Sequence, residues 1–123
     1  MKALTIRQPW ANLIATGQKR IELRTWSTDY RGELLIIAGK QAWVGETSYP
    51  IGGPFGATVC IVTLADVRDV VPRDELGACV SVQGFRFAWV LRHPRATAHV
   101  PATGRLKLFD PAPITLARLR EGL

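Results

Sequence analysis

The residues most capable of chemistry lie in one short segment, Gly-Gln-Lys-Arg-Ile-Glu-Leu-Arg, at positions 17–24. Within it, Lys19, Glu22 and Arg24 combine two cations with one carboxylate. The two cations could hold a phosphate, a carbonyl oxygen or an oxyanion, and the carboxylate could accept a proton from a base edge or from a water. We therefore take these three side chains as the centre of a candidate site.

The local pattern indicates how the three side chains would meet. Gly17 lets the chain turn sharply, so that Lys19 can lean over the strand that follows. Residues 20–26 alternate with the period of two that is typical of a half-buried strand, which places Glu22 and Arg24 on one face. The pattern predicts that a cation, an anion and a guanidinium share one spot.

Three further side chains are candidate ligand contacts. A strand is predicted over 3–7, and a helix is predicted to begin at Pro9, with Gln8 and Trp10 at the junction. Trp26 follows the polar strand. A polar group and two aromatic rings beside an arginine are what a nucleobase pocket requires, although a tryptophan in a helix is more often part of the core.

The same spacing has a second interpretation. Lys19, Glu22 and Arg24 could form an exposed ladder of ion pairs on the outer face of the sheet. Such a ladder contributes under ~1 kcal/mol and carries no function. Thr25 is expected on the opposite face of the strand, away from the site.

The rest of the chain is predicted to be mostly β. Strands are expected over 33–38 (buried on both faces), 57–71 (bent near Asp66), 85–91 (ended by His93-Pro94), 96–100 and 105–109. A short helix is expected over 41–44, an irregular segment over 72–84, and a strand or helical turn over 114–119. Six or seven strands with one or two helices suggest an α+β, mostly β fold built on a closed or nearly closed barrel.

Composition limits the classes of protein. The 123 residues suit a single domain over 1–123, and the absence of a long apolar run argues against a membrane span or a signal peptide and for a cytoplasmic location. Cys60 and Cys79 lie near apolar residues, as buried thiols do, and no Cys/His spacing resembles a metal site. We expect no metal, no disulfide and no cofactor.

Basic residues are in excess, with a net charge of +6 that favours encounters with polyanions. The densest late group could form a phosphate-binding rim and consists of Arg92, Arg95, Arg105 and Lys107. Lys40 is expected to be a solvated lysine after a strand, and neither His93 nor His99 is assigned a role.

At these residues the sequence resembles the ASCH domain family, a branch of the PUA-like β-barrels. Four segments carry the resemblance in the same order: Leu-Thr-Ile-Arg-Gln-Pro-Trp-Ala at 4–11, Gly-x-Lys-x-x-Glu-x-Arg at 17–24, Tyr-Arg-Gly at 30–32 leading into 34–38, and Phe-Ala-Trp-Val-Leu at 87–91. The resemblance implies a small PUA-like barrel, flanked by one or two short helices, with a cleft beside the first helix. In that cleft the signature residues would face a ligand.

The resemblance also implies a function. Members of the family are associated with binding of RNA or other nucleic acids, with coactivator-type proteins and, in one bacterial branch, with amide hydrolysis of N4-acetylcytidine. That branch has a threonine, proposed as its nucleophile, where this chain has Glu22, while Lys19 matches its acid/base lysine. The threonine mechanism therefore does not transfer to this chain.

Three functions remain open from the sequence. The first is an RNA-binding or nucleotide-binding domain with a cleft around Lys19, Glu22 and Arg24. The second is an amidohydrolase acting on an acylated nucleoside, in which Glu22 activates a water and the two cations stabilise the oxyanion. The third is a protein-interaction module that uses the same surface.

Overall fold

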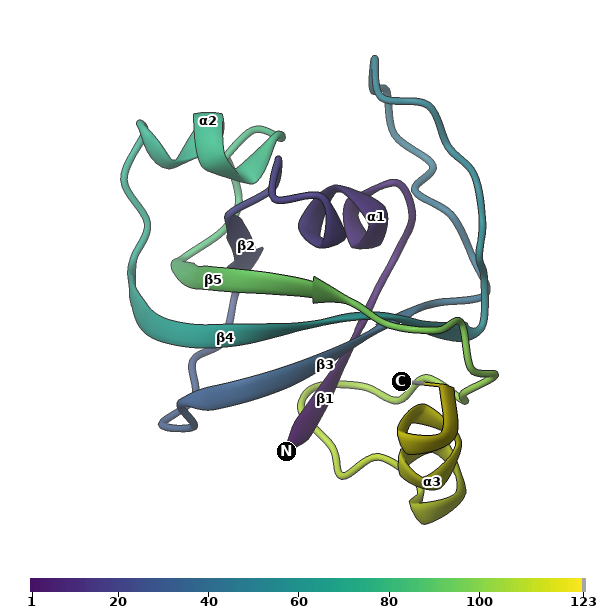
Figure 1. The fold of residues 1–123 in the computed structure, drawn as a ribbon. Helices are drawn as coiled ribbons and strands as arrows, with labels where there is room; N and C mark the ends of the chain where they lie inside the picture. The colour runs from purple at the N-terminus through teal and green to yellow at the C-terminus, as the bar shows by residue number, and fades with distance from the viewer. Residues whose placement is uncertain (123) are drawn as a thin grey trace.

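The computed structural model describes residues 1–122, and within them five strands curl into one sheet that forms half of a barrel (Figure 1). The elements in chain order are β1 (Lys2–Ile6), α1 (Trp10–Ala15), β2 (Ile21–Arg24), β3 (Gly32–Ala38), β4 (Ala57–Asp69), α2 (Asp74–Ala78), β5 (Phe87–Ala96) and α3 (Pro113–Gly122). The strand order is β1-β3-β4-β5-β2, with β1 and β3 parallel and the other pairs antiparallel. The expected mostly β architecture is confirmed.

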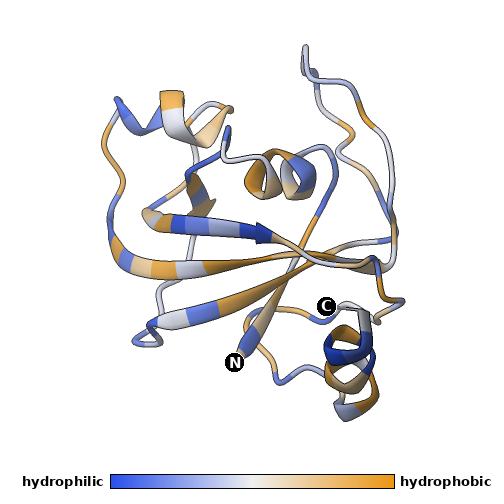
Figure 2. Ribbon diagram, viewed as in Figure 1, coloured by the Kyte–Doolittle hydropathy of each residue, from blue (hydrophilic) through white to orange (hydrophobic). Residues whose placement is uncertain are grey.

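The core lies on both faces of the sheet, and β3 serves both sides. Leu34 and Ile36 pack with α1 on one face, whereas Leu35 and Ile37 pack with Leu119 of α3 on the other. Figure 1 shows α1 and α3 on opposite sides of the sheet, and Figure 2 shows apolar residues concentrated along β3 and β4. Each such side chain contributes roughly 1.5–3 kcal/mol when fully buried. The predicted burial of this strand on both faces is confirmed.

The sheet has fewer strands than the sequence predicts, because 96–100 and 105–109 do not form strands. Isolated bridges join Ala57 to Pro101, just past the first segment, and Ala3 to Phe109, at the end of the second. A proline has no N–H for a ladder, and the positive φ of Lys107 (58°) turns the chain out of an extended path. The C-terminal region of the described chain is therefore joined to the sheet by these two bridges, and it adds no further strand to the half-barrel.

The prediction that His93-Pro94 ends a strand is wrong. In the structure β5 continues to Ala96, and its register shifts between the pairs Thr63–Arg92 and Ile61–Arg95. His93 adopts a positive φ of 53° at this shift. A bulge accommodates the proline where the ladder is already interrupted, so the strand resumes beyond it.

The helix predictions are also corrected. Residues 41–44 form no helix, because the backbone N–H of Trp43 bonds the carbonyl of Gln8 (2.8 Å) and its ring packs against α1. Helix α2 forms inside 72–84, which was predicted to be irregular. Of the two alternatives for 114–119, the helix is correct, and it brings the helices of the described chain to three.

Other local predictions hold. Strand β4 is the longest, and its register shifts between Leu64 and Asp66, where a bend was predicted. Cys60 is buried as expected, but Cys79 is only half-buried, and both are free thiols. No helix in residues 1–122 has the length and hydropathy needed to cross a bilayer.

Candidate functional site

A cleft of about 780 Å³ opens beside α1, between β2 and two loops. Part of the loop over 39–56 lines the cleft, and so does the segment 103–107, which we call the strap. The end of β1, Trp10 of α1 and two residues between α2 and β5, Val80 and Phe85, also line it. The cleft therefore forms where six separate parts of the chain meet, and its volume lies within the range of small-molecule pockets.

The predicted cluster of Lys19, Glu22 and Arg24 lies in this cleft, and we call it the triad. The Nε atom of Arg24 donates to Oε2 of Glu22 at 3.0 Å, and a second guanidinium nitrogen lies 2.8 Å from the same oxygen. The Nζ atom of Lys19 lies 3.6 Å from Oε1 of Glu22. Lys19 is 2% exposed and Glu22 is 8% exposed, so the triad is not the exposed ladder of the second interpretation.

Local structure explains how the triad is positioned. Gly17 takes a φ of 85° after α1, and the N–H of Lys19 then bonds the carbonyl of Leu13 at 2.9 Å. This fold-back sends the side chain of Lys19 under the helix. Pairing of β2 with β5 sets Glu22 opposite Trp89, which fixes the direction of the carboxylate. Gly17 therefore makes the predicted sharp turn, and the strand pattern places Glu22 and Arg24 together as predicted.

Lys19 lies in a buried environment that affects its pKa. Its ammonium donates a short hydrogen bond to the carbonyl of Ala78 and lies 5.3 Å from the ring centroid of Trp10. Burial lowers the pKa of Lys19 below its usual 10.5, and the nearby Glu22 carboxylate opposes this effect. Burial and the Glu22 carboxylate therefore act in opposite directions on the protonation of Lys19.

Trp26 forms an aromatic edge of the cleft. The guanidinium carbon of Arg24 lies 5.9 Å and Nζ of Lys107 lies 5.7 Å from its ring centroid. Its ring meets that of Trp89 edge-on at 4.8 Å, and the indole N–H of Trp89 donates to the Trp26 carbonyl at 3.3 Å. A half-buried tryptophan held in this way offers a flat surface next to cations.

Not every predicted contact lies in the cleft. Trp10 lines it, but Gln8 is fully buried elsewhere, with its amide nitrogen donating to Asn12 at 2.9 Å and to the Pro54 carbonyl at 3.0 Å. Gln8 therefore ties the 39–56 loop to α1 and acts on the site only through that loop. Thr25, expected on the far face, lines the cleft because β2 ends at Arg24.

Four further cations surround the cleft, and we call them the rim: Arg7, Lys40, Arg105 and Lys107. Arg105 and Lys107 are predicted phosphate contacts, whereas the sequence gives Arg7 no role and predicts a solvated Lys40. Among residues 1–122, no carboxylate lies within 4.0 Å of a rim cation. A cation one or two residues after each of two neighbouring parallel strands, β1 and β3, is the signal that could have found Arg7 and Lys40.

The late basic group splits in the structure. Arg105 and Lys107 lie on the strap, Arg95 pairs with Glu33 at 2.8 Å, and Arg92 lines a different groove. Arg105 and Lys107 lie between the two bridged residues Pro101 and Phe109, and this segment places them at the cleft. The four residues of the late basic group therefore do not form one phosphate-binding surface. The bulge in β5 and the turns after it place them on different surfaces.

The strap is anchored to β1. Ala3 and Phe109 exchange two backbone hydrogen bonds of 2.8 and 3.2 Å, and the N–H of Arg105 donates to Oγ1 of Thr5 at 3.1 Å. The Thr5 carbonyl in turn accepts from Arg24 at 3.3 Å. One residue of β1 therefore connects the triad to the strap, and the strap carries two rim cations.

The fold and the site together define a half-barrel domain with a cationic cleft beside its first helix. The ASCH domain model matches residues 4–100, and the chain belongs to the ASCH domain family. The crystal structure of ASCH from Zymomonas mobilis superposes with a TM-score of 0.72 at 13% identity, covering 98% of this chain and 93% of that one. A serine-to-alanine mutant of the same protein gives 0.71 at 13% identity, with 98% and 94% covered.

Two curated relatives match shorter segments. Human Activating signal cointegrator 1 is 51% identical over 35 residues, which is 28% of this chain and 6% of that protein. The mouse protein of the same name is 48% identical over 46 residues, which is 37% of this chain and 8% of that protein. The match therefore spans only a small part of these longer proteins.

Proposed function

We propose that this domain binds RNA, or a nucleotide derived from it, in the cleft that contains Lys19, Glu22 and Arg24. The observation that carries the proposal is the imbalance of charge: of the described residues that line the cleft, six are Lys or Arg and one, Glu22, is an acid. Gathering so many cations around one cavity produces a local positive potential that attracts anions, and the buried Lys19 adds to it. Phosphate is the anion for which arginine is best suited.

The arrangement of the side chains divides the ligand into two parts. The triad provides a carboxylate acceptor and two cationic donors, which match the amino and carbonyl groups on the edge of a base. Trp26 offers a ring on which a base can stack. The rim lies outside these groups and would hold phosphate oxygens. The association of ASCH domains with RNA supports this assignment.

A titration of cytidine monophosphate against cytidine tests the proposal. The rim should make the nucleotide bind at least ten-fold more tightly than the neutral nucleoside, because only the nucleotide carries phosphate. The double variant Arg105→Gln/Lys107→Gln should remove most of this preference. The matched control is Arg118→Gln/Arg120→Gln on α3, which removes the same charge from exposed positions outside the cleft. Equal affinity for the two ligands would contradict the proposal.

Amide hydrolysis is the second candidate, favoured by the buried Lys19 beside Glu22. In this reaction Glu22 takes a proton from a water, whose oxygen attacks the acyl carbon of an N4-acylated cytosine, while Arg24 and Lys19 hold the oxyanion. Collapse of the adduct breaks the C–N bond, and Lys19 supplies the proton to the leaving amine. Glu22 then returns its proton to Lys19, and the products are the amino form of the base and a carboxylate whose proton is lost to solvent.

Incubation with N4-acetylcytidine, followed by chromatography, tests the second candidate. Release of acetate and cytidine that is lost in both Lys19→Ala and Glu22→Gln would establish hydrolysis. An unchanged rate in Glu22→Gln would exclude water activation by this carboxylate. A protein that neither turns over acylated nucleosides nor binds nucleotides would instead fit the interaction module.

A further inference from the structure

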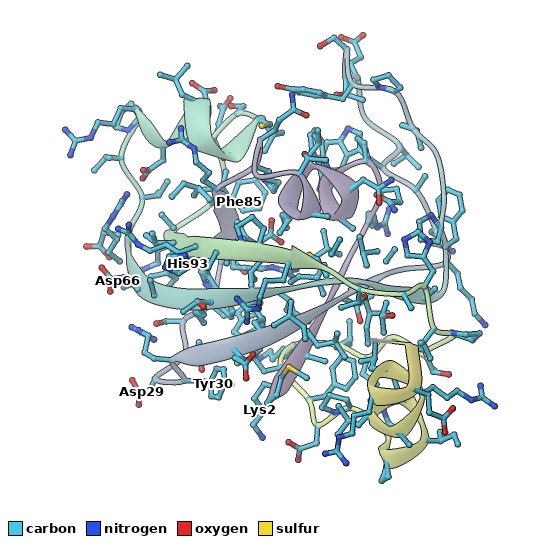
Figure 3. The ribbon with its side chains drawn as sticks, viewed as in Figure 1. Lys2, Asp29, Tyr30, Asp66, Phe85 and His93 are labelled. Carbon is cyan, nitrogen blue, oxygen red and sulfur yellow. The ribbon has the colours of Figure 1, made fainter. Side chains whose placement is uncertain are left out.

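A second groove, of about 630 Å³, opens on the other side of the segment that leads into β2. It lies between the turn after α1, helix α2 and the bulged part of β5, where Figure 3 labels His93. Arg20, Arg73 and Arg92 line it together with His93. Nothing in the triad or the rim uses these four residues.

The second groove has an excess of positive charge. The three arginines are exposed, and among residues 1–122 no carboxylate lies within 4.0 Å of their guanidinium groups. Asp74 is the one acid of the described residues that line the groove, and both of its oxygens already accept hydrogen bonds from Arg68. The groove therefore presents guanidinium donors with no internal partner.

Its shape depends on an unusual backbone. His93 holds a positive φ of 53° inside a strand, which costs a non-glycine residue roughly 1–3 kcal/mol. The bulge at this point directs Arg92, His93 and Pro94 to the groove. Exposed Leu76 of α2 adds an apolar surface beside the arginines. Cations next to apolar surface suit a single nucleic-acid strand, which exposes both phosphates and base faces.

The groove and the cleft adjoin each other. Lys19 lines both, and Arg20, the next residue, lines the groove. Consecutive α-carbons lie about 3.8 Å apart, which is less than the length of one nucleotide. A strand that leaves the cleft therefore meets the groove arginines within a few nucleotides.

We infer that the second groove binds the sugar–phosphate backbone of a single nucleic-acid strand, one nucleotide of which occupies the cleft. The inference rests on the proposed function and extends it: the ligand is an oligonucleotide, and the domain contacts it on two sides of the segment at 19–21. The guanidinium groups of Arg20, Arg73 and Arg92 hold consecutive phosphates, and the base edge is recognised only in the cleft.

The test compares cytidine monophosphate with a single-stranded RNA of about 15 nucleotides, a length within the range of single-strand sites. The RNA should bind at least ten-fold more tightly than the mononucleotide. The double variant Arg73→Gln/Arg92→Gln should lose most of that gain and keep its affinity for the mononucleotide. Its salt slope for RNA between about 50 and 200 mM should fall by about 1.4, as expected when two phosphate contacts are removed.

The control is again Arg118→Gln/Arg120→Gln, which lowers the net charge equally on the far face of the sheet. If the groove variant and this control weaken RNA binding by the same amount, general charge explains the binding and the groove is not a site. If RNA binds no more tightly than the mononucleotide, the ligand is confined to the cleft and the inference fails while the proposed function stands. Failure of the mononucleotide to bind would overturn both.

Discussion

Two buried carboxylates, Asp74 on α2 and Glu22 on β2, each bind an arginine, but the two ion pairs are built differently. Asp74 accepts two parallel hydrogen bonds from Arg68, of 2.7 and 2.8 Å, and a third of 2.9 Å from the N–H of Val71. The bidentate bond from Arg68 is the main reason that the pKa of Asp74 falls to about 2. This pair ties the start of α2 to the end of β4, and it engages both oxygens of Asp74 within the protein.

Glu22 is held more loosely. Both contacts from Arg24 reach one oxygen, Oε2, while the nearest cation to Oε1 is Lys19 at 3.6 Å. Within residues 1–122 no group donates a hydrogen bond of 3.5 Å or less to Oε1. Donors on Arg24 and an acceptor on Glu22 therefore remain available at the wall of the cleft.

The comparison shows how the structural Arg68–Asp74 ion pair differs from the Arg24–Glu22 pair, which we propose binds a ligand. Burial is similar, since Asp74 is 5% exposed and Glu22 is 8% exposed. The difference lies in how many hydrogen-bonding positions the protein itself fills. Asp74 accepts hydrogen bonds at both oxygens and stabilises the fold, whereas Oε1 of Glu22, with Lys19 at 3.6 Å, is the acceptor that we propose for the ligand.

The largest effect that we predict is on stability, in Asp74→Asn. Neutralising this carboxylate should lower the free energy of unfolding by about 2 kcal/mol, because charge-assisted hydrogen bonds are lost. Urea denaturation at pH 7 measures the change, and nucleotide affinity should stay the same. The folded pKa is depressed, so the contribution is present above the ordinary value of 3.8 and disappears as the pH falls toward 2. A cost that persists at pH 2 would contradict this account.

Glu22→Gln should show the reverse pattern. Its stability cost should be about 1 kcal/mol, because the amide oxygen can still accept from the partly solvated Arg24, and because Lys19, whose pKa burial lowers, can release its proton when the carboxylate is gone. Affinity for cytidine monophosphate should fall about ten-fold, because a charged acceptor for the base is lost. Isothermal titration and urea denaturation of the same sample measure both effects. A stability loss as large as that of Asp74→Asn would erase the distinction between the two ion pairs.

The sequence predicted the triad correctly because its geometry is local. A glycine turn and a strand of period two fix the relation between Lys19, Glu22 and Arg24 over six residues. The same reasoning correctly identified β1, α1, β3 and β4. Each of these elements has a pattern that its own residues determine.

Errors arose where distant contacts decide the structure. The continuation of β5 past Pro94 depends on a bulge opposite β4, and α2 begins at Asp74, whose carboxylate binds Arg68 of β4. The place of the strap at the cleft depends on the bridge between Ala3 and Phe109 and on the hydrogen bond from Arg105 to Thr5, which joins residues 100 positions apart. Gln8 was misplaced for the same reason, since its partner in the 39–56 loop is 46 residues away.

Gly104→Ala should weaken binding with little loss of stability. A Cβ at this position would lie 2.7 Å from Cγ2 and 2.8 Å from Oγ1 of Thr5, closer than real Cβ contacts. Since Thr5 is β-branched and stiff, the exposed strap should move and carry Arg105 and Lys107 away from the triad. We expect a several-fold loss of affinity for cytidine monophosphate and a midpoint of unfolding that stays close to the original. An unchanged affinity would show that the strap does not position the rim.

The smallest effect that we predict is a change of stability with pH in the alkaline range, which arises at Lys19 of the triad and not at the Arg68–Asp74 pair. Burial lowers the pKa of Lys19 below 10.5, so between the folded and unfolded values the unfolded chain binds more protons. The free energy of unfolding should therefore rise with pH in that window. Lys19→Met, which keeps the length of the side chain, should lack this rise.

The measurement is the difference in unfolding free energy between the original protein and Lys19→Met from pH 7 to about 10.5, the ordinary value for lysine. Titration of the other lysines and tyrosines largely cancels in this difference. An increase with pH would show that the buried ammonium of Lys19 destabilises the folded protein. The charge of Asp74, by contrast, stabilises the fold, and its contribution is lost at acid pH. A difference that does not change with pH would mean that Glu22 fully compensates the burial of Lys19. The triad would then have its charges balanced within the protein, as the Arg68–Asp74 pair has.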